Sequence, residues 1–372
     1  MAFDPDRKLA PQIRIVENAL IVPSADGDFR GLFRKAGVYD GDGHYLPLAE
    51  CLRSPGLPIT MRPGTPPPEA QDHLKGCWLY GGMLFSHFGH FLLQSTSRLW
   101  AAEHVDDKLD GTIFLTRQRM TWPARYVRPL VPRLRHFGPG TENPVGVVKP
   151  VRVERLVVAP QGFGGGPAIA GCPEFRDYIH RHFGRDVPAE GAEKIYISRT
   201  KLFTKRSRYL AEPRIEALLE KEGYRIFHPQ TLPFEEQIAQ YKAARRIISC
   251  DSSALHLAAL LAGPDTQVAM TLRRSEDMAP EFIDQFRYLC GVSPVVIDTI
   301  TKQYQRRLSD GVIQPGGTFS EIDFAKMGRE LHAAGFIGDR SGWTAPPPEM
   351  LAAERRAIEE SNGVELVEKP VD

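Results

Sequence analysis

Short apolar runs alternate with amphipathic stretches along the second half of the chain. Each run is rich in Ile, Val, Tyr and Phe, and the stretch after it has apolar residues three and four positions apart, the patterns of buried strands and of helices. We predict strands at Lys194–Ser198, Tyr224–His228, Arg246–Cys250, Gln267–Thr271 and Pro294–Asp298, and helices at Glu212–Glu222, Pro233–Ala244, Ser252–Ala262 and Met278–Leu289. Because crossovers between parallel strands are right-handed, this alternation predicts a doubly wound parallel sheet.

The first half of the chain has a mixed pattern. We predict strands at Gln12–Pro23, Gly76–Leu84, Gly111–Thr116 and Val153–Pro160, and helices at Phe88–His104 and around Pro123–Arg135. The glycine-rich segment Gln161–Gly171 is typical of a linker or a mobile loop. We therefore predict an α/β protein with domains at residues 1–170 and 171–300, followed in residues 301–372 by helices near Glu321–Ala334 and Pro348–Asn362.

Composition adds limits on the partners and the compartment. Of the 372 residues, 42% are hydrophobic and 25% are charged, and the formal net charge is +1, so neither nucleic acid nor an anionic membrane is expected as the main partner. The five cysteines are scattered, the N-terminus lacks the apolar core of a signal peptide, and no apolar run reaches the ~20 residues of a membrane span. We expect a cytoplasmic protein.

Basic residues follow the first strand of the predicted parallel sheet, where ligands of such sheets bind. Ser198-Arg199-Thr200-Lys201 comes directly after this strand, and Lys205, Arg206 and Arg208 follow. The segment is either a solvated basic loop or a phosphate-binding loop, and its position gives the two interpretations equal weight.

Small residues and further arginines follow the third and fourth strands. Asp251-Ser252-Ser253-Ala254 opens a helix, whose N–H groups form an anion site, while Asp251 or Ser252 would also serve as an ordinary N-cap. His256, taken alone, is more often a core histidine than a functional one. Arg273 and Arg274 follow the fourth strand. Donors on three consecutive loops favour a nucleotide diphosphate over a neutral ligand.

Several common nucleotide and metal motifs are missing. The first strand leads into Ser-Arg-Thr-Lys rather than GxGxxG, and Gly162-x-Gly164-x-Gly166 runs into Pro167, which argues against a dehydrogenase. No P-loop motif is present, which excludes P-loop kinases and ATPases. Asp40-Gly41-Asp42 is more typical of a turn than of metal ligands, so we predict no metal.

Two histidines mark the first half of the chain. His87 and His90 flank Phe88-Gly89, after a predicted strand and before an apolar run. Histidine exchanges a proton near neutral pH, so the pair is a candidate general base, with a core histidine that orients a loop as the alternative. As metal ligands the two lack a third His, Cys or carboxylate nearby in sequence.

Four motifs in order together resemble those of glycosyltransferase family 61, whose bacterial members are often described as capsular polysaccharide biosynthesis proteins. The motifs are His87-Phe-Gly-His-Phe-Leu-Leu-Gln94 with Arg98-Leu99, Tyr196-Ile-Ser-Arg199, Glu236-Gln-Ile238 and Ser252-Ser-Ala-Leu-His256. The resemblance spans about residues 75–300. The chain departs from the family at His87, where Asn is usual, at Gln94, where an acid is usual, and at Asp251-Ser252, where the turn is usually richer in glycine.

The resemblance implies a GT-B-like fold, in which two Rossmann-like domains face each other across a cleft. Residues 1–170 would then form the acceptor side and residues 171–300 would bind the nucleotide sugar, with the C-terminal helices packing back on the N-terminal domain.

The resemblance also implies an inverting glycosyltransferase. Such an enzyme would move a hexosyl or pentosyl group from a nucleotide-sugar donor to a glycan or lipid-linked saccharide in surface polysaccharide synthesis, in the cytoplasm or at the inner face of the membrane, without a metal or other cofactor. His90, and after it His87, is the expected base. The expected donor contacts are Ser198, Arg199, Lys201, Arg206, Glu236, Ser252, Ser253, Ala254, His256 and Arg273.

Two other classes of function stay open at this point. A nucleotide-sugar epimerase of the same fold would turn over the donor without an acceptor. A non-catalytic protein would bind a nucleotide or a sugar without turnover.

Overall fold

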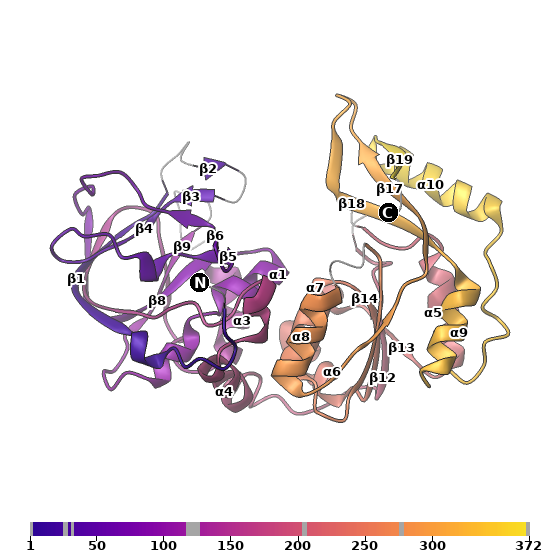
Figure 1. Ribbon diagram of the computed structural model, residues 1–372, viewed down its shortest axis with the longest axis horizontal. Helices are drawn as coiled ribbons and strands as arrows, with labels where there is room; N and C mark the ends of the chain where they lie inside the picture. The colour runs from indigo at the N-terminus through magenta and orange to yellow at the C-terminus, as the bar shows by residue number, and fades with distance from the viewer. Residues whose placement is uncertain are drawn as a thin grey trace. The chain divides into compact units, whose positions relative to one another are not determined.

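The computed structural model describes residues 3–24, 29–30, 33–116, 127–202, 207–274 and 279–369. The chain divides into two compact units, which we call unit 1 (Met1–Val187) and unit 2 (Pro188–Asp372). In Figure 1, unit 1 is coloured from indigo to magenta and unit 2 from pink to yellow. Each unit is built around a β-sheet of its own.

A six-stranded mixed sheet, in the order β10-β9-β8-β11-β1-β4, organises unit 1. Its strands are β1 (Arg14–Val22), β4 (Gly37–Tyr39), β8 (Asp72–Leu84), β9 (Gly111–Thr116), β10 (Pro144–Val147) and β11 (Val151–Val158). The first four strands in this order are parallel, and β1 is antiparallel to both of its neighbours. Because β9 and β10 lie on one side of β8 and β11 on the other, chain order reverses between β8 and β11. We call this the switch point of unit 1.

The central strand β8 is polar at its start and buried at its end. Every residue from Cys77 to Leu84 is buried, in a core that includes Ile21 and Ile113. Gly82 has φ +81°, and a Cβ there would lie 2.8 Å from Nη1 of Arg98. Only glycine suits this position, since it allows both the left-handed backbone and the close approach of the arginine.

The segment after β8 is not the single helix that the apolar pattern predicts for Phe88–His104. It contains α1 (Phe88–His90), a π-helical turn η3 (Phe91–Ser95) and a 3₁₀ helix η4 (Leu99–Glu103). The hydroxyl of Ser95 donates to the carbonyl of Met83 at 3.0 Å, and that of Ser97 to the carbonyl of Gln94 at 2.8 Å. Side-chain hydrogen bonds of this kind compete with the helical ladder, which explains the break.

Residues 161–171 pack inside unit 1, although their glycine content predicted a linker. Phe163 is fully buried and stacks on Phe175 of α4 (Pro173–His182), with ring centroids 4.3 Å apart. A Cβ at Gly162 would lie 2.5 Å from the indole nitrogen of Trp100, so this glycine serves close packing. The division of the chain therefore falls after residue 187 rather than at residue 170.

The five-stranded sheet of unit 2 is fully parallel, which confirms the prediction from the alternating pattern. Its order is β13-β12-β14-β15-β16. The elements are β12 (Lys194–Ile197), α5 (Glu212–Lys221), β13 (Arg225–Phe227), α6 (Phe234–Ala243), β14 (Arg246–Cys250), α7 (Ser253–Leu261), β15 (Gln267–Thr271), α8 (Ala279–Cys290) and β16 (Val295–Ile297). Figure 1 shows α6, α7 and α8 on one face of this sheet and α5 on the other. The order reverses between β12 and β14, the switch point of unit 2.

The C-terminal elements belong to unit 2. They are β17 (Ile300–Arg307), β18 (Ile313–Ile322), α9 (Phe324–Ala333), α10 (Pro348–Asn362) and β19 (Glu365–Lys369). Phe324 and Met327 of α9 share a core with Tyr196 of β12 and Ile215 of α5, because they cover an apolar face of the parallel sheet. The sheet β18-β17-β19 was not predicted, since β17 is mostly polar.

Short elements complete the description. They are β2 (Phe29–Arg30), β3 (Phe33–Lys35), β5 (Leu52–Ser54), β6 (Leu57–Pro58), β7 (Thr60–Met61), α3 (Val131–Leu134) and 3₁₀ turns at Ala10–Gln12, Pro47–Ala49, Arg128–Leu130, Arg135–Phe137, Gly166–Ala170 and Pro229–Thr231. Across the described ranges, no helix combines the length and the apolar character that crossing a bilayer requires.

Candidate functional site

Arg199 lies just beyond the carboxyl end of β12, at the switch point of unit 2. Its backbone N–H donates to Oε1 of Glu212 at 2.9 Å, and its Nε donates to the carbonyl of Ser207 at 2.6 Å. Burial lowers the pKa of the Arg199 guanidinium, and the positive charge of Arg273 lowers it further. The two cations are therefore close enough to repel each other.

Asp251, directly after β14, is a fully buried carboxylate at this switch point. Its Oδ1 accepts the backbone N–H of Arg273 at 2.6 Å, and its Oδ2 accepts Nε of Arg274 at 2.6 Å. Nη2 of Arg273 donates to the carbonyl of Asp251 at 3.0 Å. Arg273 is only 5% exposed, and its Nε has no hydrogen-bond partner among the described atoms. One carboxylate thus serves two arginines while a third, Arg199, stands nearby.

The N-terminus of α7 points its first N–H groups toward the same edge of the sheet. Ser252 occupies the N-cap position without a side-chain cap, and the carboxylate of Asp251 is turned to the arginines instead. Ordinary capping by either side chain, which the sequence left open, is therefore not seen. Ser253 and Ala254 are partly exposed. The uncapped N–H groups and the positive end of the helix dipole suit an anion.

Glu212, at the start of α5, is a site residue that the sequence analysis missed. It is completely buried, and its Oε1 accepts the hydroxyl of Tyr196 at 3.1 Å as well as the Arg199 N–H. Burial raises its pKa to about 7. Glu216, one helical turn later, accepts the hydroxyl of Thr200 at 2.7 Å. Two acids four apart at the start of a helix after a basic loop are a signal that could have indicated this pair.

The remaining residues predicted to contact the donor have different surroundings. Ser198 is buried, and its hydroxyl donates to Glu216 at 2.5 Å, so it helps to hold the loop. Lys201 is exposed in the loop, and Glu236 is exposed in the first turn of α6. Arg206 lies outside the described residues.

His256 is engaged in packing α7 against α8. Its Nδ1 lies 2.7 Å from Oε1 of Gln285, and its ring stacks on Phe282 with centroids 4.8 Å apart. These contacts are those of a core histidine, the more common case for such a residue.

His90 follows the carboxyl end of β8, at the switch point of unit 1. Its Nδ1 lies 3.0 Å from Oε1 of Gln94, whose Nε2 donates to the carbonyl of Arg53 at 3.4 Å. Because an amide oxygen only accepts, this pairing places the hydrogen of the neutral ring on Nδ1 and leaves Nε2 as the basic nitrogen. His87 is exposed, and its ring centroid lies 5.1 Å from that of His90.

The motif arginine of unit 1, Arg98, has a structural position. It is 1% exposed, its Nε donates to the carbonyl of Ala159 at 2.9 Å, and its Nη2 donates to the carbonyl of Glu50 at 2.6 Å. The guanidinium also lies over the ring of Tyr80, 5.6 Å from its centroid. Arg98 therefore joins the segments that follow β8 and β11.

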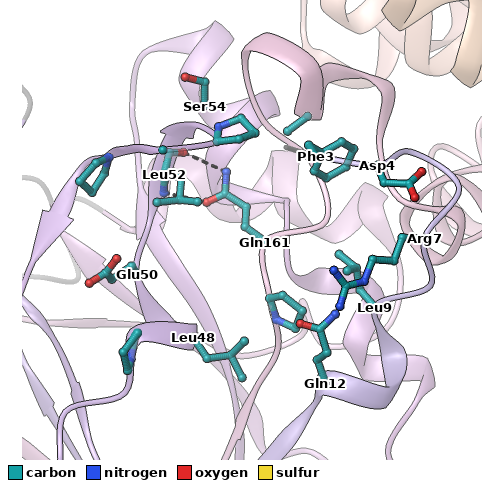
Figure 2. Close-up of a pocket in the computed structure, with 16 residues that line it drawn as sticks. Phe3, Asp4, Arg7, Leu9, Gln12, Leu48, Glu50, Leu52, Ser54 and Gln161 are labelled. Carbon is teal, nitrogen blue, oxygen red and sulfur yellow. Dashed lines mark hydrogen bonds between the residues drawn. The ribbon is translucent and has the colours of Figure 1, made fainter. Parts of the chain in front are cut away.

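A pocket of about 520 Å³ opens beyond the carboxyl end of β11. Figure 2 shows its wall, which combines apolar groups such as Phe3 and Leu48 with the charged groups of Asp4 and Arg7. Gln161 holds one side of it, since its Oε1 accepts the N–H of Leu52 at 3.0 Å and its Nε2 donates to the carbonyl of the same residue at 2.9 Å. None of the residues predicted from sequence to be functional lines this pocket.

Asp40-Gly41-Asp42 forms a turn. Oδ1 of Asp40 accepts the N–H of Asp42 at 3.0 Å and that of His44 at 2.8 Å. The possible ligand atoms of these three side chains lie within 4.8 Å of one another. The hydrogen bonds are sufficient to explain the cluster as an Asx turn.

A comparison with known families matches a stretch of the chain that includes parts of both units. A family model described as Glycosyltransferase 61 matches residues 88–269, from α1 in unit 1 to β15 in unit 2. The match includes His90, Arg199 and Asp251, and it ends before Arg273. A comparison with curated proteins finds no match.

Proposed function

Because the chain belongs to glycosyltransferase family 61, we propose that it transfers a sugar from a nucleotide-sugar donor to a hydroxyl of a glycan or lipid-linked saccharide, with inversion at the anomeric carbon. The observation that carries the proposal is the group of Arg199, Arg273 and Arg274 at the switch point of unit 2, where the buried carboxylate of Asp251 binds Arg273 and Arg274. We further propose a GT-B arrangement of the two units and a role in surface polysaccharide synthesis, in the cytoplasm or at the inner face of the membrane.

In this proposal the diphosphate of the donor binds at the switch point of unit 2. An anion there relieves the repulsion between Arg199 and Arg273, and the first N–H groups of α7 add neutral donors. Negative charge grows on the diphosphate as the bond to the sugar breaks. Donors already fixed in place stabilise that charge without a metal ion.

His90 is the proposed base. The acceptor oxygen attacks the anomeric carbon, its proton passes to Nε2 of His90, and the bond from the anomeric carbon to the diphosphate oxygen breaks with its electron pair on the diphosphate. Gln94 orients the imidazole ring through its contact with Nδ1. In the family pattern, an acid at this position takes that role. One displacement on the face opposite the leaving group gives inversion.

The acceptor binds unit 1 in this proposal. The pocket beyond β11 suits part of a saccharide, because its apolar groups can pack on the C–H faces of a sugar while Asp4, Arg7 and Glu50 can bind hydroxyls (Figure 2).

The decisive experiment is a thermal-shift and turnover screen with uridine, guanosine, cytidine and deoxythymidine diphosphate sugars. A donor at a hundred times its dissociation constant adds about 2.7 kcal/mol to the stability of the protein, an easily measured shift. Arg199→Ala should abolish the turnover and greatly reduce the shift. Arg329→Ala is the matched control, since this arginine is exposed on α9. Wild-type turnover in Arg199→Ala would refute the donor site.

Reactions with the donor alone separate the other classes of function. An isomerised nucleotide sugar formed without any acceptor would indicate an epimerase. Binding without turnover across a broad acceptor panel would indicate a binding protein.

A further inference from the structure

The C-terminal helix α10 is attached to the loop that carries Arg199. We call the described parts of this segment, residues 198–202 and 207–211, the donor loop. Glu354 of α10 accepts the N–H of Ala211 on Oε2 at 2.7 Å and Nη2 of Arg208 on Oε1 at 3.3 Å. One carboxylate therefore holds the end of the donor loop by a main-chain and a side-chain donor.

An apolar contact supports the same attachment. Leu210 of the donor loop is fully buried in a small core with Ile358 of α10, Tyr304 of β17 and Phe319 of β18. Ile358 follows Glu354 by four residues, so both lie on one face of α10. The N–H of Leu210 also donates to the carbonyl of Ser320 in β18 at 2.9 Å. Figure 1 shows α10 beside the strands of this C-terminal sheet.

Ala211 has an unusual backbone that depends on these contacts. Its φ is +58°, in the left-handed region, although it has a Cβ. Such a residue keeps its conformation only where its surroundings hold it. Glu354 binds the N–H of this residue, immediately before α5 begins at Glu212.

Along residues 207–212, the two contacts of Arg199 flank those of Glu354. Arg199 binds the carbonyl of Ser207 and the side chain of Glu212. Glu354 binds the residues next to them in sequence, Arg208 and Ala211. Arg199 and Glu354 thus both bind the segment 207–212, each at different residues. A shift of this segment would move both acceptors of Arg199.

We propose that Glu354 is a positioning residue for the nucleotide-sugar donor: through Arg208 and Ala211 it holds the segment that fixes Arg199. This inference rests on the proposed function for its ligand, a nucleoside diphosphate. It gives the C-terminal segment, which lies beyond the family match, a part in donor binding.

The test measures binding of the nucleoside diphosphate that the screen selects, by calorimetry on the full chain. Glu354→Ala should weaken binding about tenfold, the scale expected for losing charge-assisted hydrogen bonds, and should raise the KM for the donor rather than that for the acceptor. Glu354→Gln keeps one carbonyl acceptor and should lie between. Glu360→Gln is the matched control, since Glu360 is exposed on the same helix.

A double-mutant cycle tests the route of the effect. If Glu354 acts through Arg199, Glu354→Ala should add almost nothing to the loss already caused by Arg199→Ala. Two losses that simply add would overturn the inference, as would unchanged binding in Glu354→Ala.

Hydrogen exchange provides a readout without any ligand. Exchange of residues 196–202 should be faster in Glu354→Ala and Glu354→Gln than in Glu360→Gln, because the Arg199 N–H loses its fixed acceptor. Unchanged exchange in both Glu354 variants would overturn the inference, even if Glu354→Ala folds poorly. Wild-type protein that binds no nucleoside diphosphate would instead refute the proposed function, and the exchange data would still decide whether Glu354 holds Arg199.

Discussion

The two switch points use arginine in opposite ways. In unit 2, burial and the nearby charge of Arg273 lower the pKa of Arg199, and Asp251 is shared between Arg273 and Arg274. In unit 1, Arg98 donates hydrogen bonds to backbone carbonyls of neighbouring segments. The remaining polar groups beyond β8 include His90 and Gln94, which bind each other.

This difference separates a site where several arginines gather near one carboxylate from one where the arginine is bound to backbone carbonyls. Like charges held together in a fold favour a ligand that reduces their repulsion, here an anion. A buried arginine such as Arg98, whose N–H groups donate to backbone carbonyls, instead stabilises the fold. In the proposed function, the site of unit 2 binds the charged donor and the site of unit 1 acts on the neutral hydroxyl of the acceptor.

The largest expected effect concerns His90, in the site of unit 1. His90→Ala should lower the transfer rate about 10²–10⁴-fold, the range for loss of a general base, while donor binding stays unchanged. The measurement is steady-state kinetics together with calorimetric donor affinity. His87→Ala is the control and should have a smaller effect, and a full rate in His90→Ala would remove His90 as the base.

The two arginines should respond differently to the same substitution. Arg98→Met should lower the stability of unit 1 by about 3–4 kcal/mol, because two buried carbonyls lose their donor. Arg199→Met should change stability by about 1 kcal/mol or less, since it also removes a repulsion. Urea unfolding midpoints of both variants measure this. Equal losses would contradict the contrast between a structural and a binding arginine.

Glu212 gives unit 2 a pH dependence of known sign. Burial raises its pKa from 4.5 to about 7, so between these values the folded protein keeps a proton that the unfolded chain has lost. The unfolding free energy of the wild type therefore falls as pH rises from about 4.5 to about 7. Glu212→Gln mimics the protonated form, and its advantage should grow from small at pH 5 to about 3 kcal/mol at pH 8. Thermal unfolding across this range is the check, and a constant difference would contradict the buried acid.

The smallest expected effect tests whether His90 is the group that titrates in the site of unit 1. Gln94→Glu places a carboxylate beside Nδ1 of His90 and favours the charged imidazole, so the acidic limb of the pH–rate profile should move up by about one pH unit. The pH dependence of kcat/KM measures it. An unmoved limb would show that the group titrating in the reaction is not His90.

Sequence patterns predicted unit 2 better than unit 1. Three of the predicted strands have the bounds that the structure shows: Arg246–Cys250 and Gln267–Thr271 in unit 2, and Gly111–Thr116 in unit 1. Buried parallel strands between helices are short apolar runs with a clear period, so they can be recognised locally. The predicted helix Phe88–His104 is broken because hydroxyl groups form hydrogen bonds that compete with the helical ones. The strand β17 was missed because most of its residues are polar.

The candidate site was predictable only in part. Arg199 and Arg273 could be selected because each directly follows a strand. Glu212, one of two acids four apart at the start of a helix after the basic loop, had a sequence signal that was overlooked. Glu354 could not be selected, because nothing local distinguishes a bridging acid from the many exposed ones on helices.

By itself the sequence determined the alternation of elements in unit 2, the basic loop after its first strand and the motifs shared with the family, since each depends on neighbours along the chain. Only the tertiary structure decided which charges are buried and that α10 holds the donor loop. It also decided that Arg98 donates to backbone carbonyls while Arg199 lies at the switch point of unit 2. Burial and repulsion depend on segments that are distant in sequence, such as Glu354 and Ala211, and their strength comes from the exclusion of water, which exists only once the chain has folded.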